Sequence, residues 1–112
     1  MDVVSLVQQQ LDAYNSRDLH HFMSVFGDDV VVFRPPAPAP ALTGLAAVAA
    51  FFSTQRFNLP GLRAELLNRT VLGNKVFDHE RIHGVLAQPY EILVVYEVRD
   101  LLIRTVWSFS AS

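Results

Sequence analysis

Residues 11–33 read LDAYNSRDLHHFMSVFGDDVVVF, and this stretch passes from a helical pattern to an extended one. Its first part completes an apolar stripe with spacings of three and four residues, which predicts a helix with Asp2 as its N-cap and an end near residues 15–16. Asp18 is the expected N-cap of a second, shorter helix. The β-branched residues 30–33 then predict a strand. The chain is therefore expected to open with two helices that lead into a sheet.

The rest of the chain extends this order of elements. Residues 35–40, PPAPAP, cannot donate hydrogen bonds through their prolines, so we expect a loop that serves as a spacer or as a segment for an aromatic groove. Thr43 is the expected N-cap of a third helix. Four antiparallel strands are expected, at residues 63–72, 75–83, 90–99 and 102–109. Helices followed by strands predict an α+β domain in which three helices pack on one face of a strongly curved antiparallel sheet.

Length and composition limit the function. The 112 residues are expected to form a single domain, 1–112, and their hydrophobic content of 51% is high for a chain of this size. Part of that content is expected in a subunit interface or around a cavity. Nine Lys and Arg against 11 Asp and Glu, without a basic cluster, exclude an electrostatic nucleic-acid binder. The absence of cysteine excludes disulfides and thiol catalysis.

Targeting and cofactor signals are not found. The N-terminal sequence MDVVSLVQQQ has neither the basic segment nor the apolar core of a secretion signal, so we expect a cytoplasmic protein. The longest apolar run, residues 41–52, is interrupted by Thr43 and Gly44 and falls short of the ~20 residues that cross a bilayer, so no membrane contact is expected. Glycine-rich phosphate loops and HExxH motifs do not occur, and His79 has no second ligand at metal-binding spacing. Neither a cofactor nor a metal is expected.

Residues 76–82, VFDHERI, carry charge on both faces of a predicted strand: Asp78 and Glu80 share one face, His79 and Arg81 the other. Two carboxylates one residue apart on a face lie about 7 Å from each other. In an apolar site one of them would keep its proton near neutral pH and act as an acid, while the other would act as a base. The alternative is that the pair is solvated or bound to arginines of neighbouring strands, with Arg63, Arg69 and Arg104 as the possible partners.

Aromatic side chains are the expected ligand contacts. Tyr14 in the first helix and Tyr96 within a strand bring hydroxyl groups that need a partner when buried, so they either orient a ligand or bond to the backbone. Phe33, Phe52 and Trp107 are expected in the wall of a cavity or in a subunit interface. These five residues are the predicted ligand-binding set.

The helix–turn–helix–strand segment at residues 11–33, with YN-x-RD between the helices and DDV at the first strand, resembles the SnoaL-like branch of the nuclear transport factor 2-like superfamily. LNRTVLGNKVFDHERI at residues 67–82 and YEVRDLLIRTVW at residues 96–107 are similar to the later strands of small bacterial members. The resemblance implies a cone: a curved antiparallel sheet with helices on one side, an apolar cavity between them, and a homodimer formed through the outer face of the sheet. It also implies that Asp78 and Glu80 face the cavity.

The resemblance does not carry over one well-known mechanism of the superfamily. Ketosteroid isomerases of this superfamily use an Asp base together with a Tyr and a protonated Asp that form the oxyanion hole. At the matching positions this chain has Gln10, Arg34 and either Val94 or Val95, so the ketosteroid isomerase mechanism is not expected. Leu101 stands where relatives usually have the glycine of an Asp-Gly turn, which leaves the type of that turn open.

Two functions are consistent with these observations. The first is an enzyme that binds an apolar, oxygenated metabolite in the cone and performs isomerisation, dehydration or ring closure without a cofactor, with Asp78 and Glu80 as the acid–base pair. The alternative is a non-catalytic, dimeric ligand-binding or interaction module in which these two carboxylates are structural.

Overall fold

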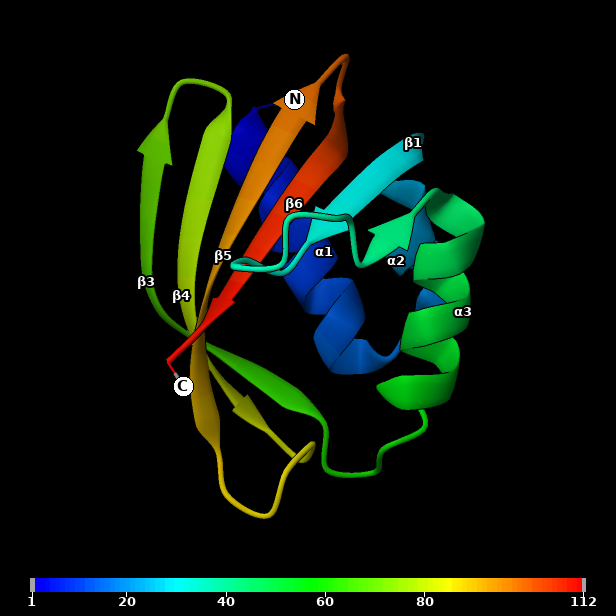
Figure 1. The fold of residues 1–112 in the computed structure, drawn as a ribbon, viewed down its shortest axis with the longest axis vertical. Coiled ribbons are helices and arrows are strands. Elements are labelled where there is room, and N and C mark those ends of the chain that lie inside the picture. The colour runs from blue at the N-terminus through cyan, green and yellow to red at the C-terminus, as the bar shows by residue number, and fades with distance from the viewer. Residues whose placement is uncertain (1, 112) are drawn as a thin grey trace.

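The computed structural model describes residues 2–111, which contain three helices on one side of a curved six-stranded sheet (Figure 1). The elements are α1 (Val3–Ser16), α2 (Leu19–Ser24), β1 (Phe26–Phe33), β2 (Leu42–Thr43), α3 (Leu45–Gln55), β3 (Arg63–Leu72), β4 (Lys75–His83), β5 (Tyr90–Arg99) and β6 (Leu102–Ser110). The predicted bounds of β3, β4 and β5 are confirmed, and β6 runs one residue beyond its predicted end. No helix in residues 2–111 has the length and apolar character needed to span a bilayer.

The first two helices begin at the predicted caps. The Asp2 carboxylate accepts a hydrogen bond from the Ser5 amide at 2.7 Å, and the Asp18 carboxylate accepts one from the His21 amide at 3.0 Å. Each bond satisfies a backbone N–H that the first helical turn leaves without a partner. Helix α1 ends at Ser16. The C-cap residue that follows, Arg17, has a left-handed φ of 56°, which turns the chain toward α2.

The region around Thr43 differs from the prediction. Thr43 does not cap α3: it lies in the short strand β2, which pairs with β1 through Thr43 with Val31 and Leu42 with Val32. The N-cap of α3 is Gly44, whose φ of 91° lets the chain turn from a strand into a helix within one residue. Thr43 pairs with β1 and therefore does not occupy the N-cap position of α3.

The strands follow the order β2-β1-β6-β5-β4-β3. Neighbouring strands are antiparallel except β1 and β6, which run parallel, so the predicted antiparallel sheet has one parallel pair. The register shifts by one residue between Leu66 and Asn68 in β3 and between Glu97 and Val98 in β5. Such bulges bend a strand and increase its twist, which is consistent with the curvature of the sheet.

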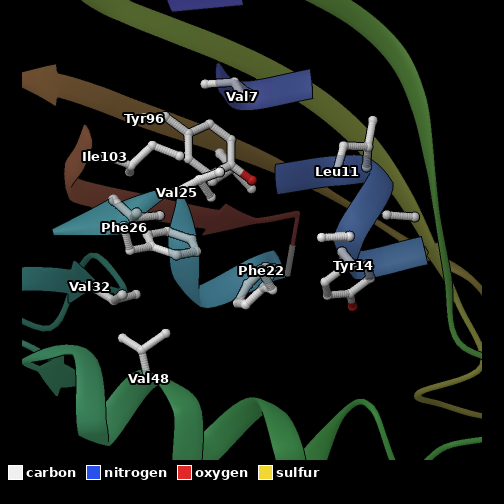
Figure 2. Packing of buried hydrophobic residues seen from close by; sticks show 14 of the residues in the cluster. Val7, Leu11, Tyr14, Phe22, Val25, Phe26, Val32, Val48, Tyr96 and Ile103 are labelled. Atoms are coloured by element: carbon white, nitrogen blue, oxygen red, sulfur yellow. The ribbon is translucent and has the colours of Figure 1, made fainter. Parts of the chain in front are cut away.

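The core lies between the concave face of the sheet and the helices. Figure 2 shows Phe22 of α2 between Phe26 and Tyr14, with Val48 of α3 pointing toward them. The Phe22 ring centroid is 4.9 Å from that of Phe26 and 6.3 Å from that of Tyr14. These aromatic contacts join α1, α2 and β1 around one interior space, which positions the site described below.

The turn between β5 and β6 contains a strained leucine. Arg99 pairs with Leu102, so Asp100 and Leu101 form a two-residue turn, and their φ angles are 51° and 65°. Positive φ at both central residues is the geometry of a type I′ turn, which the twist of the strands favours. A leucine pays a steric cost in this conformation that a glycine does not.

We expect Leu101→Gly to raise the free energy of unfolding by about 1 kcal/mol, because the steric cost is removed and little packing is lost from a side chain that is 69% exposed. Urea denaturation monitored by circular dichroism measures the change. Leu86→Gly is the matched control, since Leu86 is 65% exposed but does not have a positive φ. The control should be neutral or destabilising, and equal effects of the two substitutions would contradict the turn assignment.

Candidate functional site

A pocket of about 390 Å³ lies where the helices face the concave side of the sheet. Its walls are mainly apolar side chains of α1, α2 and α3 and of the inner faces of β1, β4, β5 and β6. The volume falls in the range of small-molecule sites, and an apolar wall with a few polar groups is typical of them. Tyr14, Phe52 and Tyr96 from the predicted ligand-binding set all line it, and so does Glu80.

Glu80 is the carboxyl group of this pocket. It lies on the inner face of β4, is 4% exposed, and its Oε2 atom makes no hydrogen bond to any residue from 2 to 111. The pKa of Glu80 is raised from its ordinary 4.5 to about 8, mainly by burial and in addition by the nearby Asp78 charge, while Arg69 opposes the rise. A carboxyl group with this pKa is mainly protonated at neutral pH, so Glu80 offers a hydrogen-bond donor and an acceptor inside an apolar space.

Asp78 shares the inner face of β4 but has a different environment. It is fully buried and forms a two-pronged ion pair with Arg69, with Nε 2.7 Å from Oδ1 and Nη2 2.9 Å from Oδ2. The remaining guanidinium nitrogen, Nη1, donates to Oε1 of Gln8 in α1 at 2.8 Å. Asp78 is not among the residues that line the pocket. Of the two predicted catalytic carboxyl groups, both are buried, but only Glu80 reaches the space that a ligand would occupy.

Other polar groups in the pocket also lack partners among the described residues. Oε1 of Gln10 is buried and makes no hydrogen bond to them. The hydroxyls of Tyr14 and Tyr96 make no hydrogen bond within residues 2–111, and burial raises the pKa of both above its usual value, which keeps them protonated. Since a buried polar group without a partner costs free energy, these atoms together favour a polar occupant. From the sequence, Gln10 was considered only as a replaced residue; the available signal was a polar side chain within the apolar stripe of α1.

Phe33 and Trp107 lie on the other side of the sheet. Their neighbours Val32 and Val106 line the pocket, and alternate residues of a strand point to opposite faces. Phe33 pairs with Trp107 across the β1–β6 ladder, and their rings are stacked at a centroid distance of 6.2 Å. The structure therefore separates these two aromatic residues from the other members of the predicted ligand-binding set, and we leave them out of the site.

Within the part of the chain that the structure describes, no group of three or more His, Asp and Glu side chains is arranged to hold a metal ion. His79 lies on the outer face of β4, where its Nε2 is 2.6 Å from Oε1 of Glu91.

Comparison with known proteins agrees with this architecture. Residues 7–106 match the model of the SnoaL-like domain family. No curated protein matches the sequence. Similar solved structures include a candidate ketosteroid isomerase from Kribbella flavida, with a TM-score of 0.84 and 20% identity over 98% of this chain and 78% of that one. A cystatin-fold protein from Novosphingobium aromaticivorans has a TM-score of 0.85 and 17% identity over 96% and 97%.

A candidate polyketide cyclase from Sinorhizobium meliloti is also similar, with a TM-score of 0.80 and 21% identity over 93% of both chains. At these identities the likeness concerns the fold, which is the nuclear transport factor 2-like α+β fold that the sequence predicted.

The different environments of Asp78 and Glu80 predict that replacing each acid by its amide has a large effect on stability at Asp78 and a small effect at Glu80. We expect Asp78→Asn to lower the free energy of unfolding by about 3 kcal/mol, because it breaks a buried ion pair and leaves Arg69 without its partner. Glu80→Gln should cost little, since it replaces a mainly protonated carboxyl group by a neutral group of the same shape. Urea melts at pH 6 compare the two variants, and similar losses would contradict the assignment.

The stability difference between Glu80→Gln and the unmodified protein should also depend on pH. The folded protein holds a proton on Glu80 that the unfolded chain releases near its ordinary pKa of 4.5. The contribution of Glu80 to stability is therefore complete below about 4.5 and is lost as the pH rises toward about 8, by about 1.4 kcal/mol for each unit of pKa shift. Melts between pH 4.5 and 9 measure this slope, which Glu80→Gln should lack. Equal slopes would show that Glu80 titrates normally.

Proposed function

The chain belongs to the SnoaL-like domain family, and from this premise we propose that it binds one small, largely apolar, oxygen-bearing molecule in the pocket and moves a proton on it through Glu80. The observation that carries the proposal is the buried Glu80 carboxyl group, which lines the pocket and has an oxygen without a partner in the described part of the chain. The relatives whose structures are named as isomerase and cyclase candidates are consistent with such chemistry but share at most 21% identity with this chain.

The proposed step uses the carboxyl group twice. Glu80 gives its proton to an oxygen atom of the ligand, and the carboxylate that forms takes a proton from a neighbouring carbon of the same ligand. The protein returns to its starting state, so the step needs no cofactor. The outcome is a shifted double bond when the oxygen stays, and a dehydration when it leaves as water. Ring closure is possible where the ligand carries a second reactive group.

The surrounding residues have supporting roles in this proposal. The hydroxyl groups of Tyr14 and Tyr96 donate hydrogen bonds to the ligand, since neither has a protein partner within residues 2–111. Phe52 forms part of the apolar wall. Asp78 does not touch the ligand; burial is the main cause of the raised pKa of Glu80, and the Asp78 charge adds to it. In this proposal Asp78 is a positioning residue and Glu80 is the catalytic residue.

The test joins binding to proton exchange. A set of small ketones, enones and hydroxyketones is screened by thermal shift with the unmodified protein, because a ligand that binds only the folded state raises Tm. A compound that binds is then incubated in D₂O, and NMR follows deuterium entering the carbon next to its carbonyl carbon. We expect binding and exchange to be lost or strongly reduced in Glu80→Gln and kept in Asp100→Asn, a matched amide change at an exposed turn residue.

Three outcomes separate the candidate functions. Exchange that depends on Glu80 supports the enzyme. Binding without exchange supports the alternative of a non-catalytic ligand-binding module. Binding and exchange that are unchanged in Glu80→Gln would contradict the proposed role of this residue.

We also propose a homodimer formed through the outer face of the sheet. The stacked rings of Phe33 and Trp107 lie on this face, and Leu93 and Phe109, which pair across β5 and β6, are 40% and 39% exposed there. Apolar side chains gathered on one face favour association of two copies. Light scattering should give twice the chain mass, and Leu93→Lys should give the mass of one chain. A single-chain mass for the unmodified protein at micromolar concentration would rule out the dimer.

A further inference from the structure

Two arginines from separate parts of the chain meet at the pocket. Arg34 follows the end of β1, and Arg56 is the C-cap residue of α3. Both contact the ring of Phe51: the guanidinium carbon of Arg34 lies 4.8 Å from the ring centroid, and that of Arg56 lies 4.9 Å from it. All three residues line the pocket. Arg34 is exposed and Arg56 is half-buried, which places this pair at the opening of the pocket.

Within residues 2–111 these two cations have neither an anionic partner nor a set of backbone carbonyls around the guanidinium group. Arg56 donates only to the backbone oxygen of Gln55, and the Arg34 side chain makes no hydrogen bond to another described residue. Neither forms an ion pair within residues 2–111. Each remaining arginine is engaged by a carboxylate or, in one case, by three backbone carbonyls: Arg63 with Glu65, Arg69 with Asp78, Arg81 with Glu65 and Glu91, Arg99 with Glu97, Arg104 with Asp29, and Arg17 with Leu59, Pro60 and Leu62.

The electrostatic situation at the opening favours an anion. Partial burial lowers the pKa of Arg34, and the positive charge of Arg56 lowers it further, so the two groups oppose each other's charge. A guanidinium that stacks on an aromatic ring keeps its N–H edge free, and this edge matches the two oxygens of a carboxylate. A carboxylate between the two arginines would receive hydrogen bonds from both and would cancel their repulsion.

We propose that the ligand of this pocket is an amphipathic organic acid, whose carboxylate binds between Arg34 and Arg56 while its apolar body, which carries a further oxygen function, fills the space beside Glu80. This inference rests on the proposed function and adds the chemical class of the ligand. The volume of about 390 Å³ limits the ligand to a small molecule. Glu80 in its protonated form does not repel such an anion, whereas a carboxylate in the same place would.

The experiment compares two probes of nearly the same shape, 2-naphthoate and its neutral amide 2-naphthamide, by isothermal titration calorimetry at pH 7. We expect 2-naphthoate to bind roughly tenfold more tightly than the amide, because only the anion forms charge-assisted hydrogen bonds with the arginines. Arg34→Gln and Arg56→Gln should each weaken 2-naphthoate binding roughly tenfold and leave amide binding unchanged. Added salt should weaken only the binding of the anion.

Two further variants keep the test interpretable. Arg99→Gln removes the same charge from an exposed position outside the pocket and should leave both affinities unchanged. Arg34→Lys keeps the positive charge and should retain part of the preference for the anion, even if Arg34→Gln proves unstable. If Arg99→Gln weakened 2-naphthoate binding as much as Arg34→Gln does, the effect would come from the net charge of the protein alone. That result would overturn the inference.

The remaining outcomes distinguish this inference from the proposed function. Equal affinities of the two probes, with no effect of the arginine substitutions, would overturn the organic-acid ligand and leave a neutral ligand in the same pocket. If Arg34→Gln weakened the binding of both probes equally, Arg34 would have a packing role. That result would also overturn the organic-acid ligand. Failure of both probes to bind the unmodified protein would count against the binding pocket itself, and with it against both proposals.

Discussion

The ion pair between Arg69 and Asp78 connects three parts of this structure. It joins β3 to β4, and the third nitrogen of its guanidinium group binds Gln8 and so ties helix α1 to the sheet. It also defines the surroundings of Glu80, two residues along the same strand face. A buried ion pair requires nearly ideal geometry to offset the loss of hydration, and here the two-pronged contact provides it. Because Arg69 is engaged by Asp78, Glu80 is a buried acid that has no counter-ion among residues 2–111.

Most of the fold was predictable from local patterns, because caps and alternation depend on nearby residues. The N-caps Asp2 and Asp18 predicted both N-terminal helices. Strands β3 to β6 were predicted from alternation of apolar and polar residues between turn residues. The parallel pairing of β1 with β6 and the loss of Thr43 to β2 were not predictable, since both depend on contacts between distant segments. Tertiary pairing overrides a local cap preference in such cases.

The candidate site was predictable only to the level of a strand face. Alternation along the strand placed Asp78 and Glu80 on one face, and three arginines remained as possible partners. The choice among them depends on register: the Gly73-Asn74 turn pairs Leu72 with Lys75 and, counting back, places Arg69 opposite Asp78. The bulge that follows then shifts the ladder and places Leu66 opposite Glu80. A carboxylate beside an arginine and a carboxyl group beside a leucine have different proton affinities, and alternation alone cannot show which is which.

Hydrogen bonds between α1 and β3 have a consequence for this edge of the sheet. Strand β3 is the last strand of the order, so one side of its backbone has no neighbouring strand. Near its start, the Asn15 side chain donates to the carbonyl of Ala64 at 3.0 Å and accepts from its N–H at 2.8 Å. The side-chain amide thus imitates one peptide unit of a further strand. A foreign chain that approaches this border finds both backbone groups already occupied, so Asn15 protects the protein against edge-to-edge aggregation at this point.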